Sequence, residues 1–471
     1  DFTQMTIKEN LEFLNKLEDP TAKYIIDPLK KQLEALEYIG LSYLTLNRVT
    51  TTLSGGEAQR LKLIRHLNSS LSDLVYIIDE PSVGLHPEDI AKINEILKSL
   101  KDKGNTVLIV EHDPDVIKEG DYIIDMGPGS GKNGGEITFE GTYNELLSSN
   151  TSTGNALRHK HNLKENIREA NHFYNIGPVT QNNLNNVKTS IPKQVLTVLT
   201  GVAGSGKSTL VKAGFENNDH TIFIDQKAVQ GSNRSNLLTY LGVFDSVRSF
   251  FSKETGLNKA MFSYNSKGAC PNCGGKGYIK TELAFMGDFS QTCEVCHGKR
   301  YKQEVLDATI DGYSIADVLD LTVDEGIIFF DKKNDIKSKL QSVSKTGLNY
   351  MSLGQPLSTL SGGEIQRVKL AQHLDEEIKN SIFIFDEPTT GLHESDIPIL
   401  MECFDDLIDQ NNTVILIEHN LSIMCEADWI IDVGPGPGLD GGKVQFSGTP
   451  KNFIDSSETL TSKHLKRYIN Q

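Results

Sequence analysis

The residues best suited to chemistry in this chain are a lysine and a serine within one glycine-rich segment, GVAGSGKST. The apolar run VLTVLT precedes this segment, and a helix is expected to begin near Thr209. This order of strand, G-x-x-x-x-G-K-S loop and helix is typical of a phosphate-binding loop, in which backbone N–H groups surround the phosphates. We expect Lys207 to reach the β and γ phosphates and Ser208 to hold Mg²⁺. The predicted nucleotide contacts are Gly201, Gly204, Ser205, Gly206, Lys207, Ser208 and Thr209.

Two pairs of adjacent acids follow apolar runs that are expected to be buried parallel strands. The run SIFIF leads into Asp386 and Glu387, and the run LVYII leads into Asp79 and Glu80. We expect the first acid of each pair to hold Mg²⁺ through water and the second to orient an attacking water.

Three further polar side chains are expected at the ends of strands. His419 follows the run VILIE, and His112 follows the run VLIVE. Ligands collect at the carboxyl ends of strands in open parallel sheets, so we expect both histidines to sense a γ-phosphate. Gln226, at the end of TIFIDQ, is a candidate contact for Mg²⁺ or water, and the alternative is a surface glutamine without a role.

An internal repeat relates these residues to one another. LSGGEAQR, which starts at Leu53, recurs as LSGGEIQR at Leu360, a separation of 307 residues (360 − 53). Both acidic pairs and both histidines follow the same offset, so two copies of one module lie in tandem. The phosphate loop occurs once, and its counterpart would precede the first residue. We therefore expect a fragment or processed product that lacks the front of its first module.

The repeated LSGGE segment also has a local explanation. Ser54 and Glu57 form a Ser-x-x-Glu capping box, which predicts a helix through EAQRLKLIRHL. The two glycines leave backbone N–H groups open to an anion at the positive end of that helix. The dipole contributes only about 0.3–1 kcal/mol, so the helix must complement a phosphate that another loop already holds. The predicted contacts are Ser54, Gly55 and Gly56 in the first copy and Ser361, Gly362 and Gly363 in the second.

Four of the six cysteines form two Cys-x-x-Cys pairs, Cys270 with Cys273 and Cys293 with Cys296. The 19 residues between the pairs match the spacing of tetrathiolate zinc sites. Structural zinc contributes about 10–16 kcal/mol in small modules, enough to fold a segment with little apolar core. We expect Zn²⁺ here, and a redox-active dithiol is the alternative.

Length and charge narrow the remaining classes of function. The 471 residues allow about three domains of roughly 150 residues each. No apolar run reaches the roughly 20 residues that cross a bilayer, so we expect a cytoplasmic protein without a membrane partner. The net charge of −16 neither supports nor excludes binding to nucleic acid. Cys403 and Cys425 stand alone and are expected to be buried, inert thiols.

The fold class expected from these patterns is α/β, with two tandem P-loop modules. Residues 1–150 would form the C-terminal part of the first module, and residues 151–170 a polar linker. Residues 171–471 would form the second module. Because the cysteine pairs interrupt that module, residues 240–345 are expected to be an inserted zinc-binding and helical domain.

In combination these motifs resemble the UvrA family of ATP-binding-cassette (ABC) ATPases, which recognise damage in bacterial nucleotide excision repair. The resemblance covers essentially the whole chain. It rests on GVAGSGKST, TYLGVFD, FSYNSKGACPNC, CEVCHGKRY, TLSGGEIQRVKLA, DEPTTGLH, IEHN and ADWIIDVGPGPG. A zinc knuckle between the phosphate loop and LSGGE is a specific combination that transporter ATPases do not share.

The resemblance implies an ATPase that uses ATP, Mg²⁺ and Zn²⁺, forms a homodimer, probes double-stranded DNA for damage and makes no incision itself. In the full-length protein it implies a UvrB-like partner. It also implies that two modules face each other head to tail. The ATP held by Lys207, Ser208, Gln226, Asp386, Glu387 and His419 would then meet Ser54, Gly55 and Gly56. The other site would combine Asp79, Glu80 and His112 with Ser361, Gly362 and Gly363.

One alternative comes from within the same group of proteins. After IDQ the sequence contains GSNRS, where the family usually has Gly-Arg-Thr-Pro-Arg-Ser. The family's UvrB-binding insertion belongs to the front of the first module, which this sequence lacks. UvrA-like paralogues found with antibiotic resistance share every motif given above. The alternative hypothesis is therefore an ATP-gated DNA-binding protein that protects against DNA-binding drugs without a role in excision.

Overall fold

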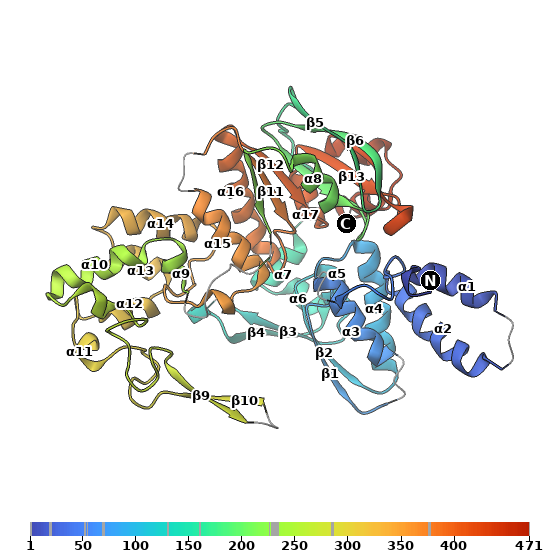
Figure 1. Ribbon diagram of the computed structural model, residues 1–471. Helices are drawn as coiled ribbons and strands as arrows, with labels where there is room; N and C mark the ends of the chain where they lie inside the picture. The colour runs from blue at the N-terminus through green and yellow to red at the C-terminus, as the bar shows by residue number, and fades with distance from the viewer. Residues whose placement is uncertain are drawn as a thin grey trace. The chain divides into compact units, whose positions relative to one another are not determined.

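The computed structural model describes residues 2–17, 21–50, 53, 55–67, 71–129, 131–159, 162–225, 227, 235–283, 287–374 and 378–470. Two of the predicted contacts, Ser54 and Gln226, lie outside the described residues. The chain divides into two compact units, whose elements are labelled in Figure 1. The first comprises Asp1–Pro128, Gly134–Asp225 and Ile378–Gln471, and the second comprises Gly129–Asn133 and Gln226–Glu377. Among the described residues, no helix has the length and apolar character needed to cross a membrane.

A six-stranded sheet forms the centre of the first unit (Figure 1). Its order is β14-β13-β7-β12-β11-β8, and every neighbouring pair is parallel except β13 with β14. All five residues of β7 are buried, because helices cover a parallel sheet on its faces. The strands are β7 (Leu196–Thr200), β8 (Thr221–Ile224), β11 (Ile382–Asp386), β12 (Thr413–Ile417), β13 (Trp429–Gly434) and β14 (Lys443–Gly448).

Helices alternate with these strands, which confirms the predicted α/β fold class. The core beneath the sheet joins Leu199 of β7 and Ile384 of β11 with Leu210 of the helix after the phosphate loop. An antiparallel hairpin packs on that same helix. The elements are β5 (Phe173–Gln181), β6 (Leu184–Pro192), α8 (Lys207–Phe215), α16 (Ile397–Asp409), α17 (Leu421–Glu426), α18 (Pro450–Ser456) and α19 (Leu460–Ile469).

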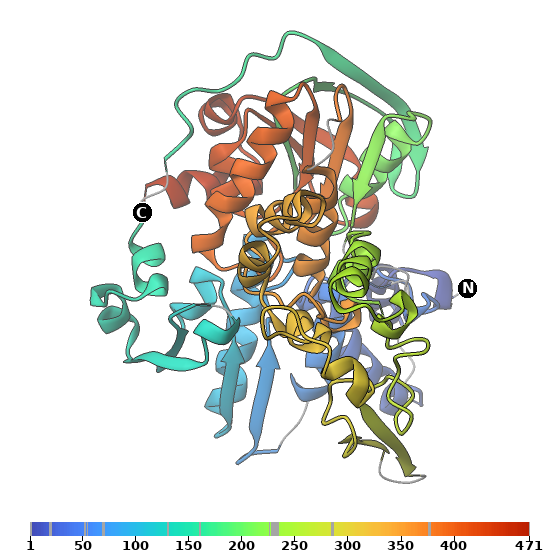
Figure 2. The same ribbon diagram turned by 90° about the vertical axis from the view of Figure 1, so that its left-hand side faces the viewer.

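The first module repeats part of this architecture at the offset of 307 residues. Its strands β1 (Val75–Asp79) and β2 (Thr106–Val110) pair in parallel, as Figure 2 shows in blue, and correspond to β11 and β12. Strands β3 (Ile123–Gly127) and β4 (Glu136–Gly141) form a separate antiparallel pair. In the second module β7 lies between β12 and β13 and pairs with both. Among the described residues of the first module, no strand lies between the corresponding strands β2 and β3. Ile77 of β1 is 75% exposed, whereas its counterpart Ile384 is 1% exposed and shares a core with Leu210 of α8.

Helices cover one side of the first module. Leu33, Leu63 and Ile93 belong to its apolar core. Thr6 and Glu9 form a capping box at the start of the first α-helix, each bonding the other's backbone N–H. The helices are α1 (Ile7–Asn15), α2 (Lys23–Tyr38), α3 (Gly55–Leu67), α4 (Pro87–Asp102), α5 (Pro114–Ile117), α6 (Tyr143–Ser148) and α7 (Ser152–Arg158).

The second unit is built from helices and one hairpin. Its core contains Phe251, Phe262, Tyr301 and Leu340. The hairpin consists of β9 (Tyr278–Leu283) and β10 (Gly287–Thr292), and the cysteine pairs flank it. The helices are α9 (Leu237–Tyr240), α10 (Phe244–Thr255), α11 (Gln303–Leu306), α12 (Ile315–Asp320), α13 (Val323–Phe329), α14 (Asn334–Lys345) and α15 (Gly362–Leu374). Cys403 and Cys425, which lie in the first unit, are buried as expected.

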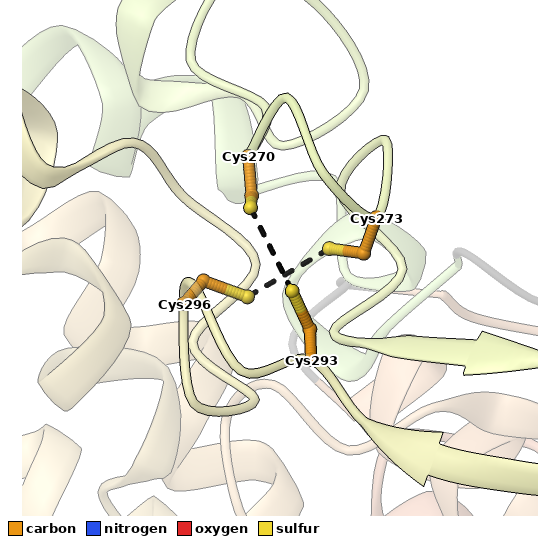
Figure 3. A group of neighbouring side chains, drawn as sticks. All are labelled: Cys270, Cys273, Cys293 and Cys296. Carbon is orange, nitrogen blue, oxygen red and sulfur yellow. Dashed lines mark hydrogen bonds between the residues drawn. The ribbon is translucent and has the colours of Figure 1, made fainter.

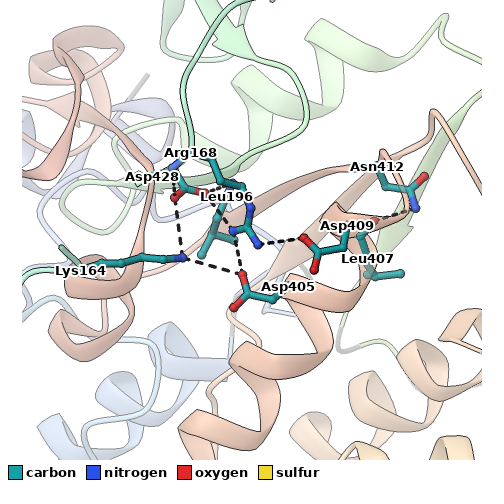
Figure 4. Close-up of polar contacts among 8 residues, drawn as sticks. All are labelled: Lys164, Arg168, Leu196, Asp405, Leu407, Asp409, Asn412 and Asp428. Carbon is teal, nitrogen blue, oxygen red and sulfur yellow. Dashed lines mark hydrogen bonds and ion pairs between the residues drawn. The ribbon is translucent and has the colours of Figure 1, made fainter. Parts of the chain in front are cut away.

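A buried carboxylate ties the segment before β5 to the central sheet (Figure 4). Asp428 has a side chain that is 1% exposed, and it accepts hydrogen bonds from the backbone N–H groups of Arg168 and Leu196, each at 2.9 Å. Lys164 Nζ lies 3.7 Å from the same carboxylate, and the Arg168 guanidinium lies 3.4 Å from it. The Arg168 guanidinium also contacts Asp405 at 2.8 Å. Two N–H donors and two cations thus compensate the burial of the Asp428 charge.

Replacing this carboxylate should destabilise the chain. Asp428→Ala leaves two backbone N–H groups without their acceptor, and each buried unsatisfied donor costs about 1–3 kcal/mol. The matched control is Asp409→Ala, since Asp409 pairs with Arg168 at 3.3 Å but is 72% exposed, and such pairs contribute about 0–1 kcal/mol. We expect the urea midpoint to fall clearly for the first variant and little for the second. Equal midpoints for the two variants would contradict the anchoring role of Asp428.

Candidate nucleotide and metal sites

Strand β7 delivers the glycine-rich segment to the carboxyl end of the sheet. At Gly201 an added Cβ would lie 2.0 Å from the carbonyl oxygen of Val433, so only glycine fits at this turn. Lys207 Nζ donates to the carbonyl oxygens of Gly201 at 2.8 Å and Val202 at 3.0 Å. Burial lowers the pKa of Lys207 to about 8, and Glu387 and Asp386 oppose this effect. The loop thus combines a buried amine with the N-terminus of α8, an arrangement suited to a polyanion.

Two oxygens beside the loop fit a hard divalent cation. Ser208 Oγ, in the first turn of α8, donates to Asp386 Oδ1 at 3.3 Å. Asp386 is the last residue of β11, and Lys212 Nζ lies 3.6 Å from its other carboxylate oxygen. Because hydroxyl and carboxylate oxygens are the ligands that Mg²⁺ prefers, these residues match the donor set that such a cation needs.

Glu387 and His419 form a pair next to this cation site. Glu387 has a φ of 53°, a left-handed backbone conformation that non-glycine residues rarely adopt and that often marks functional sites. Its Oε1 lies 3.8 Å from Nε2 of His419. Burial, followed by the charges of Glu418 and Asp386, raises the pKa of Glu387 to about 7, and burial lowers the pKa of His419. A carboxyl group with a pKa near neutrality beside a neutral imidazole can orient a water and manage its proton.

The first module carries the same arrangement. Asp79 is the last residue of β1, and Glu80 follows it with a φ of 45°. Glu80 Oε1 lies 3.8 Å from Nδ1 of His112. Burial raises the pKa of Glu80, as it does in the second module. The repeat therefore extends from sequence to backbone strain and to a glutamate–histidine contact, which is made by Nδ1 of His112 in the first module and by Nε2 of His419 in the second.

Two buried glutamates that sequence reasoning missed hold these segments in place. Glu418 accepts from the backbone N–H groups of Thr389 at 3.0 Å and His419 at 2.7 Å. Glu111 does the same in the first module, where it accepts from the N–H groups of Ser82 at 2.9 Å and His112 at 2.8 Å. Both glutamates stand in the repeated IEHN and VEHD segments, so the offset of 307 residues was the signal that could have identified them.

The first LSGGE segment lies in the same unit as the phosphate loop. Glu57 in α3 is 6% exposed and accepts a hydrogen bond from the hydroxyl group of Tyr43. The ring of Tyr43 lies against the phosphate loop, because a Cβ added to Gly204 would lie 2.9 Å from its Cζ. Tyr43 thus connects α3 with the loop that holds Lys207. Sequence reasoning missed this residue, although its hydrogen bond recurs at the offset of 307 residues as Tyr350 with Glu364, at 2.7 Å.

The second LSGGE segment belongs to the other unit. Ser361 and Glu364 form the capping box that the motif suggests, since the Ser361 N–H donates to Glu364 at 2.8 Å and the Glu364 N–H donates to Ser361 Oγ at 3.3 Å. Gly362 and Gly363 open α15. The predicted partners Asp79, Glu80 and His112 lie in the first unit, so the structure does not bring these two groups together within one unit.

The four paired cysteines converge from the turns on either side of the β9–β10 hairpin (Figure 3). The Sγ atoms of Cys270 and Cys293 are 3.9 Å apart, those of Cys273 and Cys296 are 3.7 Å apart, and all four lie within 4.8 Å of one another. Disulfides require about 2.05 Å, whereas a tetrahedron with metal–sulfur bonds of about 2.3 Å has edges of about 3.8 Å. The Asn272 amide donates to Cys293 Sγ at 3.3 Å, which favours a thiolate. The cluster has the geometry of a metal site.

The chain is similar to several known proteins. A family model described as ABC transporter matches residues 184–390. UvrABC system protein A of Clostridium perfringens is 42% identical over 100% of this chain and 54% of its own length, and that of Bacillus subtilis is 41% identical over 99% and 53%. The crystal structure of UvrA2 from Deinococcus radiodurans gives a TM-score of 0.92 at 38% identity, over 99% of this chain and 63% of that one. The chain spans about half the length of the curated relatives it matches.

Proposed function

Because the chain belongs to the UvrA family of ABC-type ATPases, we propose that it binds and hydrolyses ATP as part of a protein that recognises damaged double-stranded DNA in nucleotide excision repair. The observation that supports the ATPase function is the convergence of Lys207, Ser208, Asp386, Glu387 and His419 at the ends of adjacent parallel strands. The relatives called UvrABC system protein A support the repair function.

In the proposed site each group has one task. The amides of Gly201, Gly204, Ser205 and Gly206, with Lys207 and Thr209, bind the phosphates of ATP. Ser208 and Asp386 hold Mg²⁺, which would neutralise charge on the β and γ phosphates. Glu387 orients the attacking water, and His419 contacts the γ-phosphate. Ser54, Gly55 and Gly56 complete the site from the opposite module, and Gln226 adds a contact to Mg²⁺ or water.

A second site in the proposal uses the other set of residues. Asp79, Glu80 and His112 would face Ser361, Gly362 and Gly363 across a second ATP. Such a site needs a phosphate loop of its own. The 471 residues contain a single phosphate loop, the one with Lys207. We therefore assign hydrolysis by this chain to the site of Lys207.

The remaining partners follow from the family. We propose Zn²⁺ in the four-cysteine cluster, a homodimer as the working form, a UvrB-like partner for the full-length protein and a cytoplasmic location. The domain limits proposed from the sequence also remain, with an inserted zinc-binding and helical domain at residues 240–345.

Replacing the glutamate beside the phosphate site tests the proposed hydrolysis. Glu387→Gln should bind ATP with near-wild-type affinity but turn it over at least about 100-fold more slowly, because the amide cannot accept a proton from water. The matched control is Glu80→Gln, which changes the same residue type in the module without a phosphate loop and should leave turnover by this chain nearly unchanged. Hydrolysis by Glu387→Gln at the wild-type rate would contradict the assigned role.

The raised pKa of Glu387 adds a pH dependence to this experiment. The carboxylate is the form that accepts a proton, and it is lost as the pH falls through about 7. Turnover should therefore decline below pH 7 in the wild-type chain and in Glu80→Gln. A rate that stays constant down to pH 5.5, at saturating ATP, would argue against Glu387 as the residue that manages the proton of water.

The cysteine cluster predicts metal content. The chain should purify with about one zinc ion, because four thiolates fill one tetrahedral site. Cys293→Ser should lose most of that metal and lower the melting midpoint, since metal affinity contributes directly to folding. Cys403→Ser, at a buried cysteine far from the cluster in sequence, should keep its full zinc content. A metal-free chain with an unchanged melting midpoint would remove the zinc assignment.

A comparison of two DNA substrates separates the repair function from its alternative. The departure from the family pattern at GSNRS favours the alternative of an ATP-gated DNA-binding protein that confers drug resistance without excision. The repair function predicts at least about tenfold tighter binding to a lesion-bearing duplex than to the same undamaged duplex, in the full-length protein and at fixed salt. Equal, weak binding to the two duplexes would favour the alternative.

A further inference from the structure

A histidine outside the predicted site lies buried where the two modules meet. His86 ends the segment DEPSVGLH of the first module and is fully buried. Its Nδ1 accepts a hydrogen bond from the backbone N–H of Glu88 at 3.2 Å. Burial lowers the pKa of His86 to about 3, so the ring is neutral at physiological pH. A neutral ring that accepts at Nδ1 carries its proton on Nε2 and can donate from there.

The donor at Nε2 points to a residue of the second module. Nε2 of His86 lies 3.1 Å from the hydroxyl oxygen of Thr461 in α19. That hydroxyl donates in turn to Oδ1 of Asp432 in β13, at 3.4 Å. All three residues are buried, and the ring tautomer fixes the direction of the two hydrogen bonds from His86 through Thr461 to Asp432.

The two ends of this chain of hydrogen bonds reach different parts of the candidate site. Asp432 pairs with Thr200 of β7, and a Cβ added to Gly201 would lie 3.1 Å from its Oδ1. The ring of His86 lies edge-on to that of His419, with 6.0 Å between ring centroids. Gly84, two residues before His86, lies against the other member of the Glu387–His419 pair. A Cβ added to Gly84 would lie 2.9 Å from Oε2 of Glu387.

The same arrangement occurs a second time with the modules exchanged. His393 follows His86 by 307 residues, and its Nε2 lies 3.1 Å from the hydroxyl oxygen of Thr153. Thr153 donates to Oδ1 of Asp125 at 2.8 Å, and Asp125 is the counterpart of Asp432. Nδ1 of His393 accepts from the backbone N–H of Ser395, as Nδ1 of His86 accepts from Glu88. Thr153 stands one position away from the exact offset of Thr461 (461 − 153 = 308), yet its hydroxyl group links the same two residue types. A second contact of histidine, threonine and aspartate argues against incidental packing.

We infer that His86, Thr461 and Asp432 form a relay of positioning residues that keeps the phosphate loop of one module in register with residues 80–86 of the other. The inference rests on the proposed ATP hydrolysis. The relay acts through Gly201 at one end and through the Glu387–His419 pair at the other. Because the loop amides and Lys207 supply the binding of phosphate, the relay affects turnover more than affinity.

Substitutions at Thr461 test the relay with little change in shape. Thr461→Val removes the hydroxyl group and should lower kcat about 10- to 100-fold, the cost of a small misplacement, while the Kd for ATP changes less than about threefold. Thr461→Ser keeps the hydroxyl group and should recover most of the rate. His86→Leu should match Thr461→Val, and the double variant should be no slower than either single one. Lys463→Ala, at an exposed position of α19, controls for changes to that helix.

The outcomes that overturn the relay differ from those that overturn the ATPase function. A wild-type kcat in Thr461→Val, or rate losses that multiply in the double variant, would overturn the relay. A wild-type chain without ATP hydrolysis would contradict the proposed function instead. In that case NMR of the chain labelled with ¹⁵N-histidine still tests the relay. His86 should show a slowly exchanging Nε2–H proton, and the chemical shift of that proton should change in Thr461→Val. An Nδ1–H tautomer for His86 would overturn it.

Discussion

The hydrogen bonds that hold β7 between β12 and β13 place the phosphate loop beside the ends of its neighbouring strands. Gly201 can turn only because it has no side chain, and the turn brings the Lys207 amine over the carbonyl groups of Gly201 and Val202. Asp386 and Glu387 reach the same place because β11 pairs with β12 in register. The chemistry of the site therefore depends on a parallel sheet whose strands all end at one edge.

The first module shows what happens to the same sequence pattern without that central strand in the described residues. Its strands β1 and β2 pair in the same register as β11 and β12, and Glu80 adopts the same left-handed backbone as Glu387. Its sheet is nevertheless exposed, with Ile77 and Leu108 facing solvent where Ile384 and Ile415 are buried. The strand ends can thus form locally, whereas burial of the sheet face depends on elements such as α8, whose Leu210 shares a core with Ile384 and Ile415.

The sequence could specify most of the local features because each lies within a short segment. The run before Gly201, the glycines of the loop and the helix after them form one continuous strand–loop–helix unit, and the α/β fold class predicted from such units is confirmed. The spacing of the four cysteines was also enough to predict that they gather at one site. The roles assigned to the individual site residues stay predictions.

The features that could not be predicted depend on contacts between distant segments. The hydrogen bond from His86 to Thr461 joins residues 375 apart in the chain, and the contact of Tyr43 with Gly204 joins the two modules. No periodicity or spacing describes such contacts. Only the repeat hinted at them, since the Tyr43–Glu57 bond and the His86 relay each recur at or near the same offset.

We propose that one ATP is held by the phosphate loop of the second module and that the LSGGE helix of the first module completes its binding site. This proposal is tested most directly by a crystal structure of the chain with Mg²⁺ and a non-hydrolysable ATP analogue. We expect the β and γ phosphates on the loop from Gly201 to Thr209, Mg²⁺ between Ser208 and Asp386, and a backbone N–H of Gly55 or Gly56 within about 3 Å of a γ-phosphate oxygen. An analogue bound to the loop with α3 turned away from its γ-phosphate would contradict it.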